Sequence, residues 1–586
     1  MKSNHKLRTA FQKIKKSYPQ LKEQVASAKK KQLWHLESVI RNQIKRLQAM
    51  PPQQLPEYSK VYHNYSELLD VVSEQLLAQY NQKNHTDYRF EEIVSEDTAG
   101  YLKSGIIAVL VTSHIPQMVS AEFSRLLPKH PQDEYPEARR QKRMFYLHLG
   151  DTNTGKTYQA LQRLKQAGSG IYLAPLRILA LENFERLCSE GVPCSLLTGE
   201  EEVKTQGARH LCCTVEKAGL NSSYDVAVID EVQLVEDSQR GDAWTRAILG
   251  LNCPEIHLCG ARLAKDQLLA MIRDCGDEYE LKEYTRLVPL QIEHTPYKLS
   301  DVKPGDALVA FSKRGVLKLS SYFSQKGINN SVIYGDLPPE VRKLQYEAFI
   351  QGVNPVLVAT DAIGMGVNLP IRRLIFTDVE KFDGEDFRLL TTQEVKQIAG
   401  RAGRIGIYEV GYVACMDESI HLVEQRLEAE DEPIEYAVIG PSEAILKIGM
   451  LPLEEKLALW STEPEELPYY RKKDVRNELL ILNLLRPYRL AENVQWRLMR
   501  IPFDPGSEVL LNQFMEYADE CFAQKQKELS KPVLLGESCG ELETYYQQVN
   551  LYYSFSKTMN LTLEEEWVSD IRKKISKKID ALLQKS

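Results

Sequence analysis

Two series of short apolar runs, separated by helix-length segments, constrain the fold of this chain more than any other feature. The first series extends from Phe145 to Cys259, and the second follows Pro304-Gly305 and extends to Cys415. Short apolar runs are typical of strands buried on both faces, and their alternation with helices is typical of a parallel sheet. The sequence therefore predicts an α/β protein with two tandem parallel-sheet lobes.

The segments on either side of the two lobes are predicted to be helical. Prolines 51, 52 and 56 end a basic helical region, and the apolar spacing is helical again beyond about residue 430. A chain of 586 residues is long enough for about three or four domains. We expect a helical N-terminal region with a basic arm at 1–135, a first lobe at 136–290, a second lobe at 291–430 and a helical C-terminal domain at 431–586.

A glycine-rich loop follows the first predicted strand and ends in Lys156-Thr157. In a loop between a strand and a helix, glycines let backbone N–H groups and the helix N-terminus face phosphates. The lysine then reaches the β and γ oxygens, and the threonine holds Mg²⁺. The sequence therefore predicts a nucleoside triphosphate site. Its residues are Gly150, Thr152, Asn153, Thr154, Gly155, Lys156 and Thr157.

A later strand delivers two carboxylates to the same edge of the first sheet. The apolar run 226–229 leads directly into Asp230-Glu231-Val232-Gln233, and open α/β sheets bind ligands at the carboxyl ends of their strands. We expect Asp230 to hold Mg²⁺ together with Thr157. Glu231 is expected to orient and deprotonate the attacking water.

Beyond these two motifs, the chain resembles a superfamily-two helicase, motif by motif and in order. Segments that resemble the nucleic-acid backbone motifs of the first lobe are Pro175-Leu-Arg177, Thr198-Gly-Glu200 and Thr214-Val-Glu216. Cys259-Gly-Ala261 stands where the coupling motif belongs. Segments that resemble the last three helicase motifs are Phe311-Ser-Lys-Arg314, residues 359–369 and Gln397-Ile-Ala-Gly-Arg401-Ala-Gly-Arg404.

The amino-acid sequences of these motifs are similar to those of the Suv-three type, the RNA helicase of the mitochondrial degradosome and its bacterial relatives. The similarity is strong over about residues 140–430 and weaker beyond. It implies two RecA-like lobes, ATP as the nucleotide, and 3′ to 5′ translocation that unwinds RNA or RNA-containing duplexes. Ala261-Arg262 departs from the family, which commonly has an acidic residue there.

The resemblance also implies roles for residues on the two walls of a cleft between the lobes. Arg404 would be the arginine finger, with Arg401 as its neighbour on the phosphates, because an arginine supplied across a cleft stabilises charge on the γ-phosphate. Gln233 and Gln397 would sense closure, and Gly366 would join the nucleotide site. The implied nucleic-acid contacts are Pro175, Arg177, Thr198, Gly199, Thr214, Glu216, Ser312, Arg314 and Thr360. Such backbone contacts predict low sequence specificity.

Two other functions stay open at this point. The chain could be a DNA or hybrid helicase or translocase, because contacts to the 2′-hydroxyl cannot be recognised in these motifs. It could also be a nucleotide-switched scaffold that binds a nuclease or the ribosome and hydrolyses ATP slowly. The resemblance to the degradosome helicase further implies a role in RNA degradation and an exoribonuclease partner.

The first 50 residues carry a strong positive charge, although the whole chain has a net charge of −7. They contain 13 Lys and Arg residues against Glu23 and Glu37. Such a segment can neutralise phosphates. Its apolar spacing also suits a solvated helix with a lysine-rich outer face, and both interpretations stay open.

The sequence also carries expectations about location. Its longest aliphatic run, 106–111, is far shorter than the roughly 20 residues that span a bilayer, and no secretory signal follows Met1. Ten scattered cysteines without a C-x-x-C pair predict reduced thiols. We therefore expect a soluble protein of the bacterial cytoplasm without a membrane partner. A mitochondrial location is less favoured, since residues 1–22 contain a single arginine and little serine.

Overall fold

The computed structural model describes residues 2–364, 368–384, 386–465 and 467–584. The chain forms two compact units. The first consists of Met1–Leu127 and Lys447–Leu459, and the second of Pro128–Leu446 and Trp460–Ser586.

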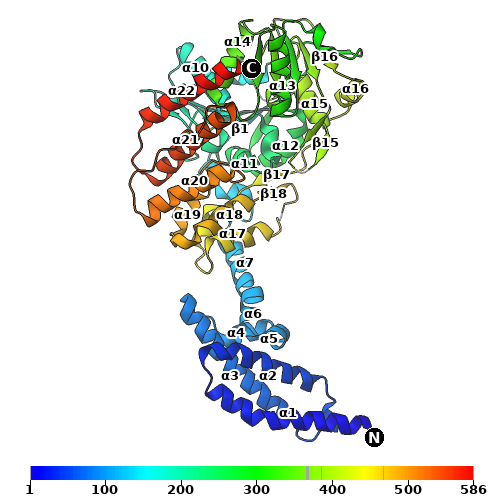
Figure 1. The fold of residues 1–586 in the computed structure, drawn as a ribbon, viewed down its shortest axis with the longest axis vertical. Coiled ribbons are helices and arrows are strands. Elements are labelled where there is room, and N and C mark those ends of the chain that lie inside the picture. Colours follow the sequence, from blue (N-terminus) through cyan, green and yellow to red (C-terminus); the bar gives the residue numbers. More distant parts are fainter. Residues whose placement is uncertain (1, 365–367, 385, 466, 585–586) are drawn as a thin grey trace. The chain divides into compact units, whose positions relative to one another are not determined.

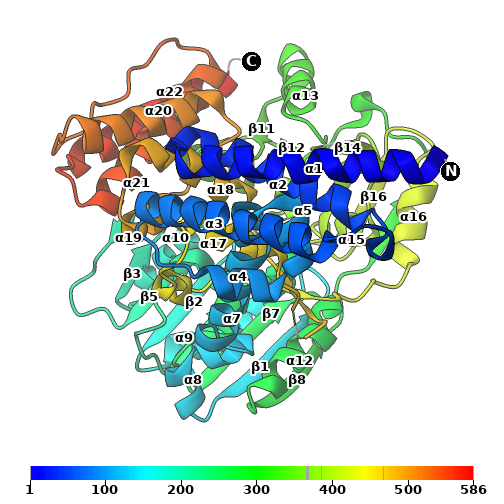
Figure 2. The ribbon, with the colours of Figure 1, turned by 90° about the horizontal axis from the view of Figure 1, so that it is seen from below.

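The first unit is helical. Its long helices α1 (Lys2–Ala26), α2 (Leu33–Gln48) and α3 (Tyr58–Asn84) lie side by side (Figures 1 and 2). Residues at helical spacing, such as Phe11 and Ile40, are buried between them, because one apolar stripe on each helix must face the others. The shorter helices are α4 (Phe90–Glu96), α5 (Thr98–Ser104), α6 (Ile106–Val109) and α7 (Ile115–Leu126), with a π-helical turn at Leu110–His114.

One helical stretch of this unit, Ile106–Leu126, is long and apolar enough to cross a membrane by length and composition. It has 21 residues and a mean hydropathy of 1.3, and 44% of its most apolar window is buried inside the structure. Buried core helices of soluble proteins share these properties.

The second unit begins with an eight-stranded sheet, in the order β4-β3-β5-β2-β6-β7-β1-β8. Figure 2 shows most of these strands side by side. All neighbours are parallel except β3 and β4. The strands are β1 (Met144–Gly150), β2 (Gly170–Ala174), β3 (Cys194–Leu197), β4 (Glu202–Val203), β5 (His210–Thr214), β6 (Val226–Ile229), β7 (Glu255–Gly260) and β8 (Glu278–Tyr284). The helices of this first lobe are α8 (Pro136–Arg140), α9 (Lys156–Gln166), α10 (Arg177–Ser189), α11 (Gly241–Gly250) and α12 (Lys265–Asp274).

A second sheet, with six parallel strands in the order β11-β12-β10-β13-β16-β9, forms the second lobe. Its strands are β9 (Leu290–Glu293), β10 (Asp306–Val309), β11 (Asn330–Ile333), β12 (Val356–Ala359), β13 (Arg373–Phe376) and β16 (Gly411–Cys415). Its helices are α13 (Lys313–Gln325), α14 (Pro339–Ile350), α15 (Thr392–Ala399) and α16 (Ile420–Glu428), and β14 (Glu380–Phe382) and β15 (Phe387–Leu389) form a separate hairpin. The predicted α/β class with two parallel-sheet lobes is confirmed.

Two buried or half-buried carboxylates stabilise the second lobe. Asp306 of β10 is fully buried and accepts hydrogen bonds from Arg373 Nε at 3.1 Å and Nη2 at 2.6 Å. Glu394 of α15 accepts two hydrogen bonds from Arg388, each at 2.9 Å, and lies 2.6 Å from Lys381 Nζ. Burial alone would raise the pKa of Glu394, but these two cations lower it to about 2.

The C-terminal part of the second unit is mainly helical. It contains β17 (Ala437–Ile439), β18 (Tyr470–Lys472), α18 (Arg476–Leu485), α19 (Glu492–Leu498), α20 (Glu508–Ala518), α21 (Cys539–Met559) and α22 (Glu565–Leu583). The residues of α17 (Leu453–Thr462) are divided between the two units. Helices α20, α21 and α22 lie together (Figure 1), and α22 also packs against α14 of the second lobe. The following aromatic residues of α21 are buried: Tyr545, Tyr546, Tyr552, Tyr553 and Phe555. All ten cysteines are free thiols.

Candidate nucleotide and nucleic-acid sites

The glycine-rich loop connects β1 to α9 at the carboxyl edge of the first sheet. Asn153 and Gly155 adopt left-handed backbone conformations, with φ of 57° and 78°, which turn the chain into the helix. Lys156 Nζ donates hydrogen bonds to the backbone oxygens of Gly150 at 3.3 Å and Asp151 at 2.9 Å. Thr154 Oγ1 also donates to the backbone oxygen of Asp151, at 3.1 Å. The loop is therefore held in a wrapped conformation that suits phosphate binding.

Asp230 and Glu231 follow β6 at the same edge. Thr157 Oγ1 donates to Asp230 Oδ1 at 3.1 Å, so the two predicted Mg²⁺ ligands are neighbours. Tyr172 donates to the other carboxylate oxygen at 3.0 Å. Burial raises the pKa of Asp230, and the charge of Glu231 adds to this effect. A hydroxyl next to a buried carboxylate offers the hard oxygen ligands that Mg²⁺ prefers.

Gln233 connects Glu231 to the predicted coupling motif. Its side-chain nitrogen donates to Glu231 Oε2 at 2.5 Å, and its side-chain oxygen accepts from the backbone N–H of Ala261 at 3.1 Å. Glu231 itself has a left-handed backbone, with φ of 51°. A non-glycine residue in this conformation is uncommon and is typical of functional sites.

The phosphate loop touches the second lobe directly. Asn153 Nδ2 donates to the backbone oxygen of Gly403 at 2.7 Å. A Cβ atom added at Gly400 would lie 1.7 Å from Thr152 Oγ1, so this close approach requires glycine. The glycines of the last helicase motif therefore let the two lobes meet at the nucleotide loop.

Arg401 reaches across the lobes toward the predicted catalytic carboxylate. Its guanidinium lies 3.9 Å from Glu231 Oε1 and donates to the backbone oxygen of Gly364. Gln397 contacts the same glycine, because a Cβ added at Gly364 would lie 3.5 Å from its Cγ. Within the described residues, the Arg404 side chain has no ion pair. Gly366 lies outside the described residues.

Arg286, which no sequence motif predicts, lies in the connection between the lobes. Its guanidinium donates to the backbone oxygens of Val288 at 2.6 Å, of Gly400 at 2.7 Å and of Ala402. Its backbone N–H donates to Asp151 Oδ2 at 3.3 Å. Burial lowers the pKa of Arg286 to about 10. This residue ties the arginine motif of the second lobe to the phosphate loop, and no local sequence pattern identifies it.

The predicted nucleic-acid residues lie at the carboxyl edges of both sheets. In the first lobe, Pro175 follows β2, Thr198 and Gly199 follow β3, Thr214 ends β5 and Glu216 comes after it. In the second lobe, Ser312 caps α13, Arg314 lies in α13 and Thr360 follows β12. Several are engaged with the protein itself: Ser312 Oγ accepts from the backbone N–H of Gly315 at 3.0 Å, and Arg240 binds Glu216 at 2.8 Å.

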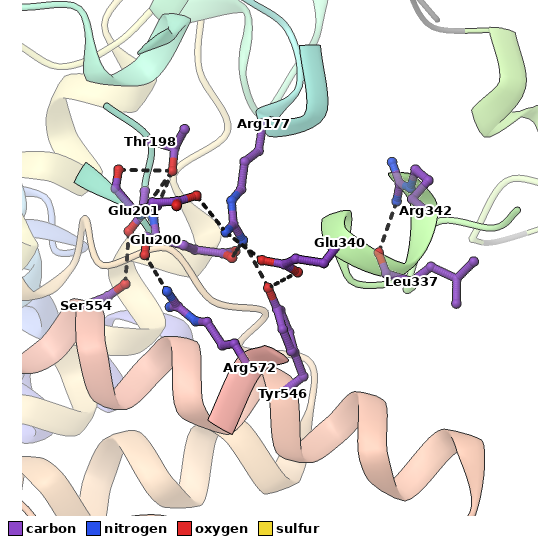
Figure 3. Close-up of polar contacts among 11 residues, drawn as sticks. Arg177, Thr198, Glu200, Glu201, Leu337, Glu340, Arg342, Tyr546, Ser554 and Arg572 are labelled. Carbon is purple, nitrogen blue, oxygen red and sulfur yellow. Dashed lines mark hydrogen bonds and ion pairs between the residues drawn. The ribbon is translucent and has the colours of Figure 1, made fainter. Parts of the chain in front are cut away.

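Arg177 lies in a cluster that joins both lobes and the C-terminal helix α21 (Figure 3). Its guanidinium pairs with Glu200, with Glu201 at 3.1 Å and with Glu340 of α14 at 3.1 Å. It also donates to the Tyr546 hydroxyl at 3.1 Å, which in turn donates to Glu340 at 2.7 Å. The side chain is 11% exposed. In this structure, the guanidinium that was predicted to bind a phosphate therefore donates its hydrogen bonds to carboxylates instead.

The C-terminal helices hold the same loop from a second side (Figure 3). Arg572 of α22 donates to the backbone oxygen of Glu200 at 2.6 Å, and Ser554 of α21 donates to that of Gly199 at 3.3 Å. On the second lobe, Glu543 of α21 pairs with Lys313 and accepts from the Tyr334 hydroxyl at 2.5 Å. The C-terminal region thus contacts the predicted nucleic-acid motifs of both lobes.

Two parallel-sheet lobes that share a phosphate loop, an Asp-Glu pair and an arginine motif define a superfamily-two helicase core. The DEXQ-box helicase domain of Suv3 matches residues 131–284, and the helicase conserved C-terminal domain matches residues 291–406. The C-terminal domain of the ATP-dependent RNA helicase SUV3 matches residues 540–585. Three separate segments of the chain are therefore similar to domains of the Suv3-type helicases.

Similar curated proteins carry related names. The chain is 44% identical over 337 residues to the DExH-box ATP-dependent RNA helicase DExH16, mitochondrial, of Arabidopsis thaliana, covering 56% of this chain and 57% of that protein. It is 44% identical over 348 residues to the rice ATP-dependent RNA helicase SUV3, mitochondrial, covering 58% of each. The human protein SUPV3L1, also named a mitochondrial ATP-dependent RNA helicase, is 42% identical over 326 residues, covering 53% of this chain and 42% of its own. The chain spans about half the length of these relatives.

The expected bacterial cytoplasmic location is contradicted by these comparisons. The relatives from human, Arabidopsis, rice and Candida albicans are all named mitochondrial. The prediction relied on the composition of the first 22 residues, and this evidence overturns it.

Proposed function

We propose that this chain is an ATP-dependent RNA helicase or translocase that moves 3′ to 5′ and unwinds RNA or RNA-containing duplexes. The observation that carries the proposal is the meeting of both lobes at one site: Glu231 of the first lobe lies 3.9 Å from Arg401 of the second. A site that is complete only when two lobes close ties hydrolysis to movement.

In the proposed mechanism, the residues of the first lobe bind the nucleotide. The phosphate loop presents its N–H groups and Lys156 to the β and γ phosphates, while Thr157 and Asp230 hold Mg²⁺. Bound Mg²⁺ would neutralise charge on the phosphates. Glu231 orients the attacking water and accepts its proton, and Gln233 fixes the Glu231 carboxylate through their 2.5 Å hydrogen bond.

The second lobe supplies the positive charge that the reaction requires. Arg404 acts as the arginine finger, with Arg401 beside it on the phosphates, since charge on the γ-phosphate is stabilised by a guanidinium that arrives on closure. Gln397 reports closure through its contact with Gly364. We include Gly366 in the nucleotide site on the motif alone.

Single-stranded RNA is proposed to lie along the carboxyl edges of both sheets. The contacts would be Pro175, Arg177, Thr198, Gly199, Thr214, Glu216, Ser312, Arg314 and Thr360. For Arg177, a phosphate would have to displace Glu340 and Tyr546, which now bind its guanidinium. RNA binding at this position is therefore coupled to a rearrangement between the lobes.

The decisive experiment measures steady-state ATP hydrolysis with and without single-stranded RNA or DNA, for the natural chain and for Glu231→Gln. We expect RNA to stimulate hydrolysis more than DNA, and the variant to lose it, because general-base catalysis contributes about 10²–10⁴-fold. Equal stimulation by DNA would favour a general translocase. No stimulation by either would favour a nucleotide-switched scaffold.

Two further parts of the proposal need their own tests. Duplexes with a 3′ or a 5′ single-stranded end distinguish the direction of movement, and unwinding of the 5′-tailed duplex alone would contradict it. We also propose an exoribonuclease partner in RNA degradation. Purification of the chain from its source without any nuclease activity would count against that partner.

A further inference from the structure

The outer faces of α1 and α2 are not used for packing within the first unit. The large apolar residues of both helices are buried, among them Phe11, Ile14 and Leu21 of α1 and Ile40 and Ile44 of α2. Since the apolar stripes face inward, the outer faces are free to carry charge. They carry no apolar stripe against which another helix could pack.

Exposed cations cover these outer faces and the turn that connects the two helices. The exposed ones are Arg8, Lys13, Lys16, Lys22, Lys29, Lys30, Lys31, Lys45 and Arg46. The two acids of this segment leave these lysines unbalanced. Among the described residues Glu23 is exposed and forms no ion pair, and buried Glu37 lies 3.9 Å from Arg41 and accepts hydrogen bonds from Ser73 at 3.1 Å and the backbone N–H of Ile106 at 3.0 Å. Within the described residues, Lys29 and Lys31 form no ion pair. The positive charge is therefore available to an external anion.

An exposed aromatic ring lies next to the densest part of this charge. Trp34, in the first turn of α2, is 55% exposed. Gln32 and Leu33 separate it from Lys29, Lys30 and Lys31, which lie in the turn between the two helices. Among the described side chains of α1 and α2, it is the one large apolar residue that is exposed. Cations combined with a flat aromatic surface are typical of proteins that bind single-stranded nucleic acid, because bases stack on the ring while phosphates pair with lysines.

We propose that Lys29, Lys30, Lys31 and Trp34 form a second binding site for single-stranded RNA, which we call the basic corner. A membrane surface would require several apolar side chains on one face, and a protein interface would require an apolar centre; the basic corner offers one exposed ring. The inference rests on the proposed function, since an RNA helicase supplies the polyanion. It adds a site outside the helicase lobes.

The test measures binding of a fluorescein-labelled single-stranded oligouridine to the full chain by fluorescence anisotropy over a series of salt concentrations. The variant Lys29→Gln/Lys31→Gln removes two charges from the basic corner. Lys60→Gln/Lys103→Gln removes two exposed charges from α3 and α5 and serves as the matched control. Each lost phosphate contact lowers the slope of log affinity against log salt by about 0.7 for a single strand.

We expect the first variant to lower that slope by about 1.4 and the control to leave it unchanged. Trp34→Ala should weaken binding about tenfold at every salt concentration with little change in slope, because stacking does not release counterions. An unchanged slope in the first variant, or an equal change in the control, would overturn the proposal.

The ATPase assay separates this inference from the proposed function. If RNA stimulates the natural chain but the basic-corner variants bind oligouridine as tightly as it does, the second site is refuted and the helicase proposal stands. If the natural chain neither binds oligouridine nor responds to RNA, both are refuted.

Discussion

Replacing Arg177 by methionine tests whether its guanidinium holds the two lobes and helix α21 together. Methionine keeps the length of the side chain but removes the charge, so Glu200, Glu201 and Glu340 would lose their common cation. Removing one partner of a buried ion pair costs about 3–5 kcal/mol, whereas exposed pairs contribute about 0–1 kcal/mol. The arginine is 11% exposed, but the three carboxylates are 30%, 36% and 31% exposed. We therefore expect an intermediate loss of about 2 kcal/mol.

The measurement is thermal unfolding of the full chain without nucleic acid. For a lobe of this size, a loss of about 2 kcal/mol lowers the unfolding midpoint by about 4–8 °C. Lys343→Met is the matched control, because Lys343 also crosses between the lobes, to Glu185 at 2.6 Å, but these side chains are 32% and 45% exposed. If Arg177→Met lowers the unfolding midpoint no more than this control does, the reasoning is refuted. Water would then solvate the three carboxylates, and the cluster would not hold the lobes together.

Three further outcomes are expected. Glu340→Gln should strengthen the binding of single-stranded RNA severalfold in an anisotropy titration, because a phosphate then competes with one carboxylate fewer for Arg177; weaker binding would contradict this. Glu394 has a folded pKa of about 2 against an ordinary value of 4.5, so it stabilises the fold above pH 4.5 and loses this effect as the pH falls toward 2. Glu394→Gln should flatten that part of the midpoint-against-pH curve. Asp306→Asn should destabilise the second lobe by about 2 kcal/mol in urea unfolding, since it removes the buried one of the two carboxylates that bind Arg373 and leaves only Glu293, at 3.0 Å. A loss under about 0.5 kcal/mol would show that the pair with Asp306 is unimportant.

The parts of the fold that are predictable from sequence are those buried on both faces. Strands such as β1, β6 and β12 are continuous apolar runs, and they lie where the sequence places them. Strand β8 was not predicted, because it lies at an edge and carries alternating charged residues, Glu278-Tyr-Glu-Leu-Lys-Glu-Tyr284. An edge strand is held by backbone pairing on one side, so its side chains need no apolar pattern.

The same distinction applies to the candidate sites. The phosphate loop and Asp230-Glu231 are local motifs, and each can be recognised from a few neighbouring residues. The partners of Arg177 are not: Glu340 and Tyr546 lie 163 and 369 positions further along the chain. Arg286 has the same character, since its role depends on backbone oxygens more than a hundred positions away. Such contacts depend on tertiary packing, which one sequence does not reveal.

The first unit is assembled from two separate stretches of the chain, and this limits how the protein can be dissected. Residues 447–459 belong to it, and within them Leu453, Lys456 and Leu457 are fully buried. A shortened protein that starts at the first lobe would keep this returning segment while discarding the helices with which it folds. The exposed Leu453 and Leu457 would favour aggregation. A soluble helicase core therefore requires that both stretches of the first unit be removed or redesigned together.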